Sequence, residues 1–393
     1  MNLYQGMMYN MRLVFFLLLL VGIPTYSQDF SPSFRWLGDI RIRSEVDMRD
    51  FDQRTHANTY TLLRTRLGLE ARPLEDVRVL IQARDSRVFG QETSTLADSR
   101  NLDLHQGYVE IAKLFLDELT LRLGRQELSY GNERMVGAVG WHNVGRVFDG
   151  GLARLDVPSF VLDLFAMNTG EVQPYTPVAT PAAVQPVSDE GSNFFGSYLS
   201  MKNIPEHTVS GYLMYEWNRS LLSGATELQR FTAGSHVKGK ADALDYECEV
   251  AYQAGKRRAV NVSAYMLTGG VGYSFAGSVF SRIAAGYELL SGSSGGPTYN
   301  SFDPAFHTGH KFYGYMDYFI SIPAQTLDRG LTDLIIRSTI TPSEKLSLNI
   351  WFHHFAYHQS AAGQRPLGQE IDLVLNLRYN KNVIFEISTS VFL

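Results

Sequence analysis

Apolar and polar side chains alternate along much of this chain with a period of two residues. The stretch from Phe34 to Phe51, FRWLGDIRIRSEVDMRDF, shows the pattern in full. Because successive side chains of a β-strand point to opposite faces of a sheet, one face of this strand is charged and the other is apolar. The charged phase holds Arg35, Asp39, Arg41, Arg43, Glu45, Asp47 and Arg49, and the apolar phase holds Trp36, Ile40, Ile42, Val46 and Met48.

The same alternation recurs to the C-terminus. We count about 18 such segments, each near the ~10 residues that a tilted membrane strand needs. The pattern predicts an all-β fold, a single closed antiparallel transmembrane β-barrel of about 18 strands over residues 28–393. The alternation is clearest in residues 60–72, 77–86, 119–123, 245–252, 345–353 and 370–378.

A soluble β-sandwich is the alternative, because its strands alternate too and bury their apolar faces in a dry core. Three features favour the barrel. The polar phases carry arginines and carboxylates together at strand centres, Tyr and Trp lie near strand ends as in an interfacial girdle, and the chain opens with a candidate export signal.

This candidate signal follows a single basic residue. Arg12 precedes an apolar run from Leu13 to Ile23, and Thr25 and Ser27 are small residues suited to a cleavage site. The run is too short to cross a bilayer core of about 30 Å as a helix. We therefore expect residues 1–27 to be a signal peptide that is removed on export.

Composition excludes some functional classes. The chain has 21 Tyr, 23 Phe and 34 Gly, and its formal net charge is −5. A nucleic-acid-binding protein needs a concentrated basic face to displace counterions, and no Lys-rich run or basic tail is present, so we expect no nucleic-acid partner. Cys248 is the only cysteine, so an intramolecular disulfide is excluded.

The connections between the alternating segments fall into short turns and long loops. The long ones are residues 88–102, 128–145, 170–192 and 291–310, and long loops of outer-membrane barrels usually face outward from the cell. Beyond residue 310 the strand parity inverts and places residues 357–367 on the periplasmic side. An inward-folding loop or a miscounted strand would each explain the inversion. Within the third loop, residues 171–191 are rich in Pro, Ala and Val, and we expect an extended loop there.

Arginine dominates the inward phases of the first five strands. Its planar guanidinium holds carboxylates or phosphates in bidentate fashion and keeps its charge, so a row of arginines would suit the passage of an anion. Pairing with neighbouring carboxylates such as Asp39 and Glu110 is the structural alternative. Both roles can hold in part if one wall is basic and the other is acidic, with Asp245, Glu247 and Glu249 as the candidate acidic wall. The predicted pore-lining residues are Arg41, Arg43, Arg64, Arg66, Arg78, Arg84, Arg122, Arg125, Arg146, Glu45 and Glu70.

An enzymatic function finds little support. His353 and His354 are adjacent, so only one of them can face the lumen. His307, His310 and His358 lie in nearby loops, but their spacing matches no known metal centre. We therefore predict no catalytic residue, metal or cofactor. A barrel-borne enzyme or adhesin that acts through its loops is the alternative hypothesis.

Residues 122–150, RLGRQELSYGNERMVGAVGWHNVGRVFDG, resemble the signature region of the alginate-export family of outer-membrane barrels. In that family a strand ending in Gly-Arg-Gln runs through a loop with Trp and Asn into an Arg-x-Phe-Asp-Gly strand. His310 to Asp317, HKFYGYMD, is a second matching stretch, and the strand layout is similar from Phe34 to Leu393. The first match rests on Gly124, Arg125, Gln126, Trp141, Asn143, Arg146, Phe148, Asp149 and Gly150.

The resemblance implies a monomeric barrel of about 18 strands in the outer membrane of a Gram-negative bacterium, surrounded by lipid and inserted by the barrel-assembly machinery. Its arginine-rich lumen would pass an anionic solute or an anionic polysaccharide of the alginate kind. One departure concerns the last strand. Such barrels often end on an aromatic residue, whereas here Phe392 is penultimate and Leu393 is last. The strand still alternates, so we expect assembly to proceed.

Overall fold

A computed structural model of the protein describes residues 30–50, 54–94, 101–170, 191–219, 227–360 and 366–393. These residues form one sheet of 18 strands. The predicted signal peptide and residues 171–190 of the predicted extended loop lie outside the described residues. The strands are β1 (Ser33–Asp47), β2 (Asn58–Leu74), β3 (Val77–Val88), β4 (Leu102–Ile111), β5 (Leu119–Gln126), β6 (Phe148–Asp156), β7 (Phe160–Gly170), β8 (Ser192–Met201), β9 (His207–Asn218), β10 (Leu228–Ala241), β11 (Leu244–Arg257), β12 (Val260–Ser274), β13 (Phe280–Leu290), β14 (Thr298–Tyr299), β15 (Leu331–Ser343), β16 (Leu346–Tyr357), β17 (Gly368–Arg378) and β18 (Ile384–Phe392).

Neighbours in sequence are neighbours in the sheet. Each strand from β1 to β13 pairs antiparallel with the next, β13 pairs with β15, and the series continues to β18. The two-residue strand β14 runs parallel to β12. None of the helices among the described residues is long and apolar enough to span a membrane. The prediction of an all-β antiparallel barrel fold with about 18 strands is confirmed.

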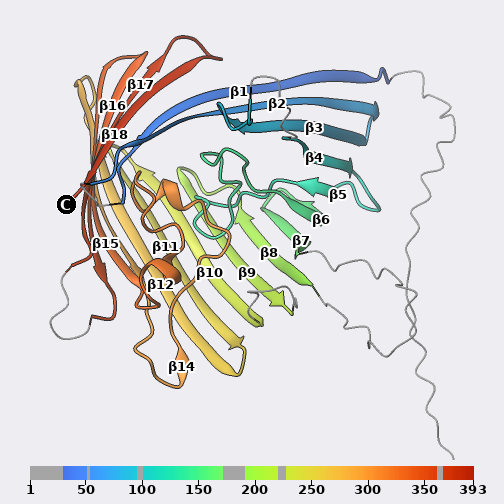
Figure 1. Ribbon diagram of the computed structural model, residues 1–393. Coiled ribbons are helices and arrows are strands. Elements are labelled where there is room, and N and C mark those ends of the chain that lie inside the picture. The colour runs from blue at the N-terminus through green and yellow to red at the C-terminus, as the bar shows by residue number, and fades with distance from the viewer. Residues whose placement is uncertain (1–29, 51–53, 95–100, 171–190, 220–226, 361–365) are drawn as a thin grey trace, which may run out of the picture.

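The sheet curls until β1 and β18 come to the same flank of the molecule (Figure 1). The described hydrogen bonds pair β1 with β2 and β18 with β17, and none joins β1 to β18. A loop bridges the two edges instead. Arg49, just after β1, donates to the Met316 carbonyl at 2.9 Å and accepts from the Tyr318 hydroxyl at 3.0 Å, and the Tyr318 ring lies 4.8 Å from that of Phe392 in β18.

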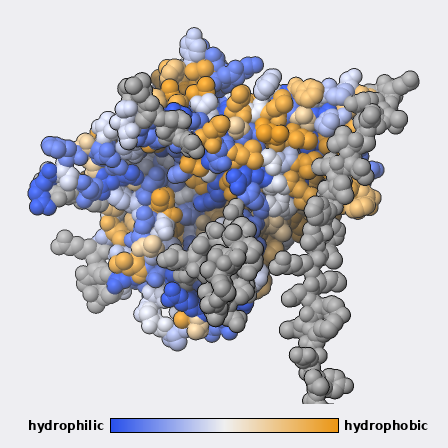
Figure 2. All heavy atoms as spheres, turned by 45° about the vertical axis from the view of Figure 1, so that its right-hand side comes forward, coloured by the Kyte–Doolittle hydropathy of each residue, from blue (hydrophilic) through white to orange (hydrophobic). Residues whose placement is uncertain are grey.

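The outer face is apolar because the period of two places every second side chain there. Ile42, Leu67 and Ile81 are 65%, 58% and 57% exposed, as side chains that meet lipid would be. Cys248 is exposed in the same phase as Val250. Apolar residues also gather in patches on the outer surface in Figure 2.

Part of the lumen face, on β6 to β9, is apolar too, which the alternation did not predict. Strands β6 to β9 turn Phe165, Met167, Phe194 and Met214 inward, where loops bury them to between 1% and 4% exposure. These strands carry apolar residues on both phases, as strands buried on both faces do. The barrel interior therefore holds a packed apolar core beside β6 to β9 and polar walls elsewhere.

The connection from residue 291 to 330 corrects the strand count beyond residue 310. It holds β14 and two short helices, η1 (Gly309–Lys311) and α1 (Ile322–Gln325), and no membrane-length strand. β15 begins only at Leu331, which lies opposite Tyr357 at the end of β16. The end of β16 at Tyr357 and the start of β17 at Gly368 therefore lie at the same end of the barrel as the long connections. The parity inversion came from a miscounted strand.

Candidate functional site

The connection between β5 and β6, residues 127–147, folds into the barrel and lies on the lumen faces of β1, β2 and β3. Its backbone carbonyls at Gly140, Trp141, His142 and Val144 point at the arginines of those strands. Arg84, 60 residues before Val144 in the chain, donates to it at 3.1 Å. The connection thus narrows the lumen at the height of the strand centres.

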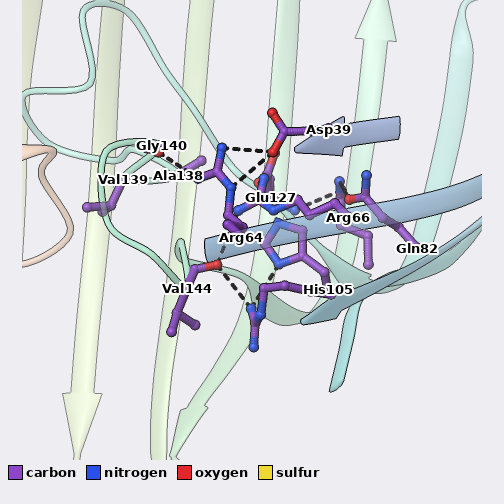
Figure 3. A network of polar contacts seen from close by, with 12 residues as sticks. Asp39, Arg64, Arg66, Gln82, His105, Glu127, Ala138, Val139, Gly140 and Val144 are labelled. Atoms are coloured by element: carbon purple, nitrogen blue, oxygen red, sulfur yellow. Dashed lines mark hydrogen bonds and ion pairs between the residues drawn. The ribbon is translucent and has the colours of Figure 1, made fainter. Parts of the chain in front are cut away.

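Five arginines hold this connection in place. Arg41 and Arg64 both donate to the Gly140 carbonyl, at 2.9 and 2.8 Å, and Arg43 donates to the Trp141 carbonyl at 2.7 Å. Arg66 and Arg84 both donate to the Val144 carbonyl at 3.1 Å. Figure 3 shows Arg64 and Arg66 beside Gly140 and Val144 of the connection. Carbonyl oxygens are neutral acceptors, so these bonds satisfy the guanidinium donors without cancelling their charge.

Gly145 allows the connection to approach so closely. Its φ of +82° lies in the left-handed region that favours glycine, and a Cβ there would come within 2.5 Å of Arg66 Nη2. Asn143 adds a second anchor, because its side-chain amide donates to the Leu63 carbonyl at 3.3 Å.

Carboxylates interleave the same arginines. Arg64 lies 3.0 Å from Asp39 and Arg84 lies 2.9 Å from Asp103. Near the C-terminal end of β4, Glu110 bridges two arginines, with N···O distances of 3.2 Å to Arg78 and 2.5 Å to Arg122. Further pairs are Arg43 with Glu45, Arg66 with Glu127, and Glu70 with Arg35 and Arg78.

His105 joins this network although its sequence context gave no signal. The pairing of β3 with β4 shifts register beside it, and its imidazole is fully buried. Since the Arg84 guanidinium can only donate, His105 Nδ1 accepts at 3.0 Å and Nε2–H donates to Glu127 at 2.8 Å. Burial alone would raise the pKa of Glu127, but the hydrogen bond from His105 and the nearby charge of Arg66 hold that pKa below its ordinary value.

The long connection 291–330 packs on the first one. Val136 and Phe306 form a parallel bridge, and the Gly137 amide donates to the Phe306 carbonyl at 2.8 Å. Arg146 ties the two together by donating to the carbonyls of Gly137, Phe306 and His307. Burial lowers the pKa of Arg146 to about 10. The two connections form one inward assembly.

Aromatic rings line the meeting point of the connections. The Trp141 ring lies between the Arg43 guanidinium, 4.1 Å from its centroid, and the His310 imidazole. Tyr315 contacts the His310 ring at 4.4 Å and the Trp351 ring of β16 at 5.2 Å. This aromatic chain therefore connects the basic wall to β16, two strands from the β18 edge of the sheet.

The opposite wall is rich in carboxylates, and it reaches further than the predicted Asp245, Glu247 and Glu249 of β11. Each of these three has a partner: Asp245 pairs with Arg282, Glu247 with His236, and Glu249 with Arg134. Further along the wall lie four more carboxylates that are buried in the lumen: Glu288, Asp333, Glu370 and Asp372.

Two predicted pore residues lie apart from the arginine wall. Arg125 shares the strand phase of Leu121 and Leu123, and it pairs with Asp149 at 2.8 Å on β6. It therefore does not belong to the row formed by Arg122 and its neighbours. Arg146 lies between the two connections, not on a strand.

The histidines form no recognisable metal centre. His353 faces the lumen, fully buried, and its Nδ1 lies 2.7 Å from Asp333, whereas His354 takes the outward phase. His310 contacts Asp317 at 2.8 Å, and His358 contacts Tyr265 at 3.2 Å. Within the described residues, no group of three or more His, Cys, Asp or Glu side chains could hold a metal ion.

Comparison with known proteins agrees with this architecture. A family model described as alginate export matches residues 36–393. No curated protein matches the chain. The fold is similar to that of OccK11 (OpdR) from Pseudomonas aeruginosa, with 13% sequence identity, a TM-score of 0.58, and coverage of 92% of this chain and 88% of that one.

Two further solved structures share the fold. OccK5 (OpdH) from Pseudomonas aeruginosa has 12% identity and a TM-score of 0.56, with 92% of each chain covered. The outer-membrane protein OpdK from the same organism has 10% identity and a TM-score of 0.58, with 91% of this chain and 92% of that chain covered. The chain belongs to the alginate export family and is an outer-membrane β-barrel channel of a Gram-negative bacterium.

Proposed function

We propose that this channel passes small anionic solutes along the arginine wall of β1, β2 and β3. The observation that carries the proposal is the row of guanidinium groups fixed against neutral carbonyl oxygens of the inward connection. Arg41 of this wall has no carboxylate within ion-pair distance among the described residues, so its charge is available to an anion. The acidic wall across the lumen adds a transverse field that orients an anion toward the arginines.

The inward connections favour a small solute. Residues 127–147 and 291–330 occupy part of the lumen, so a solute must pass between them and the strands. Several sites of moderate affinity in series would let an anion enter and also leave. One structure with the same fold was determined with vanillate, a small carboxylate, bound to OpdK.

An anionic polysaccharide is the second candidate cargo, because the family description is alginate export. The same arginine row would contact the carboxylates of such a chain. A single copy per channel and insertion by the barrel-assembly machinery stay predictions.

Bilayer recordings test the proposal. The purified protein should show a zero-current potential in a KCl gradient whose sign reports chloride preference. The double variant Arg41→Gln/Arg64→Gln should lose that preference, because it removes two charges that meet at the Gly140 carbonyl. Arg41→Lys/Arg64→Lys should keep the preference, since it retains the charges and loses only the fork geometry.

The control variant removes the same number of positive charges from another part of the same hairpin. Arg35→Gln/Arg72→Gln alters the far end of the same hairpin, where both side chains are more than half exposed, so the potential should shift much less. A cation-preferring or non-conducting wild-type protein would refute the proposal, and a sealed barrel would favour an enzyme or adhesin acting through its loops. Block of the current by anionic oligosaccharides, without block by monomers, would favour the polymer.

A further inference from the structure

The lumen face of β12 and β13 has a patch without side chains. Gly270 lies opposite Gly286, and Gly272 lies opposite Ala284, all four in the phase of the buried Thr268 and Glu288. This patch faces the interior, in the middle of β13 and near the C-terminal end of β12. It is bounded on the β11 side by Glu247, opposite Gly270, and on the β15 side by Ile335, opposite Gly286.

Backbone conformation does not explain these glycines. Gly270, Gly272 and Gly286 are absent from the residues with positive φ, so any side chain could adopt their conformation. Glycine inside a strand weakens it, and it often marks a place where a ligand approaches the backbone. A Cβ on Gly270 or Gly286 would meet only backbone atoms, at 3.2 Å or more. No side chain of the described residues comes within 4 Å of a Cβ built on Gly270 or Gly286.

An ion pair borders the patch on each of two sides. Arg134 of the inward connection contacts Glu288 at 2.5 Å on one side. On the other side, the Arg282–Asp245 pair lies over Gly272, where an added Cβ would be 2.2 Å from Arg282 Nη2. The result is a recess of about 110 Å³ with a glycine floor and charged walls.

Arg337 of the recess wall has two donors that are left over, whereas Arg134 is paired with Glu288 and leaves one. Arg337 is on β15, opposite Ala284 of β13, and its Nε and Nη2 atoms are buried without a hydrogen-bond partner. No carboxylate among the described residues lies within ion-pair distance of it. Its guanidinium rests on the Trp351 ring, 4.8 Å from the centroid. Buried donors without acceptors are costly, so this group is set up to receive an acceptor from a ligand.

We propose that the recess is a binding site for a small monocarboxylate, with Arg337 holding the carboxylate and the glycine floor receiving the carbon skeleton. This inference rests on the proposed function, and it names the substrate class. Two N–H donors on one guanidinium match the two oxygens of a carboxylate. Asp245, Glu247 and Glu288 also line the recess and repel a multiply charged anion. A cavity of about 150 Å³ holds benzene, so this smaller one fits a short hydroxy acid better than an aromatic acid.

Direct binding tests the site without reference to transport. Lactate titrated into the purified protein in detergent should give saturable heat and a saturable change in Trp351 fluorescence. Trp351→Phe should remove the fluorescence change and leave the heat. Citrate, a trianion at neutral pH, should not bind at this site.

Two variants address the two halves of the recess. Arg337→Gln should weaken lactate affinity by about tenfold or more, because the charge-assisted pair is lost. Gly270→Leu should abolish binding by filling the floor. Its matched control is Gly269→Leu, which puts the same side chain on the outer face of the same strand, where the built Cβ has no neighbour closer than 4.0 Å. Arg35→Gln controls for loss of one arginine elsewhere.

The outcomes are distinct. The proposal fails if the wild-type protein shows no saturable lactate signal, or if Arg337→Gln and Gly270→Leu, both still folded by heat-dependent gel migration, bind lactate as the wild type does. Anion-selective conductance without lactate binding would overturn this inference alone. Lactate binding in a channel without anion preference would overturn the proposed function and leave the site.

Discussion

The indole ring of Trp141 lies flat against the imidazole of His310, with centroids 4.1 Å apart and an angle of 7° between the planes. The two residues come from different connections. The same two connections also meet where the Val139 amide donates to the Thr308 hydroxyl, 169 positions further along the chain. This stack, with Arg43 on its other face, joins the basic wall to the long connection. It is a contact between the two inward connections.

Trp141→Ala should widen the channel. The change removes the cation–π contact with Arg43, worth about 0.5–2 kcal/mol, and the stack on His310. The connections should separate more often, and single-channel conductance and current noise should both rise. Trp217→Ala is the control, because Trp217 lies in the outward phase of β9 with Leu213. Unchanged conductance in Trp141→Ala would mean that the stack does not restrict the pore.

Arg146→Met should loosen the contact between the two connections. Arg146 donates to three carbonyls, and methionine leaves those of Gly137 and His307 without this donor and that of Phe306 with the Gly137 amide alone, at a cost on the order of 3 kcal/mol. Hydrogen exchange should accelerate at the Gly137 amide, which is bonded to the Phe306 carbonyl. Arg146→Lys should restore part of the protection, since one ammonium can still reach a carbonyl. Equal exchange in all three proteins would contradict the role given to Arg146.

Acidification should destabilise the long connection through His307. Its Nδ1–H donates to the Pro304 carbonyl, and its Nε2 is buried without a partner, so a second proton would have no acceptor. Burial lowers the pKa of His307 from 6.5 to about 4. Between these values the unfolded chain binds a proton that the folded chain does not, so stability falls as pH falls, by roughly 3 kcal/mol in total.

The measurement is the free energy of unfolding in detergent at several pH values. His307→Gln should be less stable than the wild type at pH 7.5, and the difference should shrink toward pH 4, because the variant lacks the titrating group. A difference that does not vary with pH would show that His307 is not buried in the neutral form.

The strands could be predicted from the sequence because, in a sheet beside lipid, a period of two places apolar side chains outward and polar side chains inward. Arg41, Arg64 and Arg66 lie inward as predicted from their phase, since Ile42 and Leu67 need the opposite face. Arg125 departs from the predicted row because it falls in the phase of Leu121, where it is neutralised by Asp149. A count of phase along β5 would have found this.

The inward connections could not be predicted in the same way. Arg43 reaches a carbonyl 98 residues further along the chain, and a backbone carbonyl leaves no trace in a sequence. The apolar part of the lumen did leave a signal, since Leu164, Phe165 and Met167 put apolar groups on both phases of β7. Such strands are buried on both faces, here by lipid outside and by loops inside.

Cys248 offers a direct test of which face meets lipid. It is exposed in β11, in the phase of Val250 and Tyr252, while its neighbour Glu247 faces the lumen and contacts His236 at 2.9 Å. In proteoliposomes a membrane-soluble maleimide should therefore modify Cys248, and a charged maleimide should not. The reverse is expected for Glu247→Cys made in a Cys248→Ser background, because that thiol would sit in the water-filled lumen. If the charged maleimide modified Cys248 as fast as it modified the thiol of the second variant, the two faces of β11 would be exchanged. The acidic wall and the glycine-floored recess beside it would then lie outside the pore.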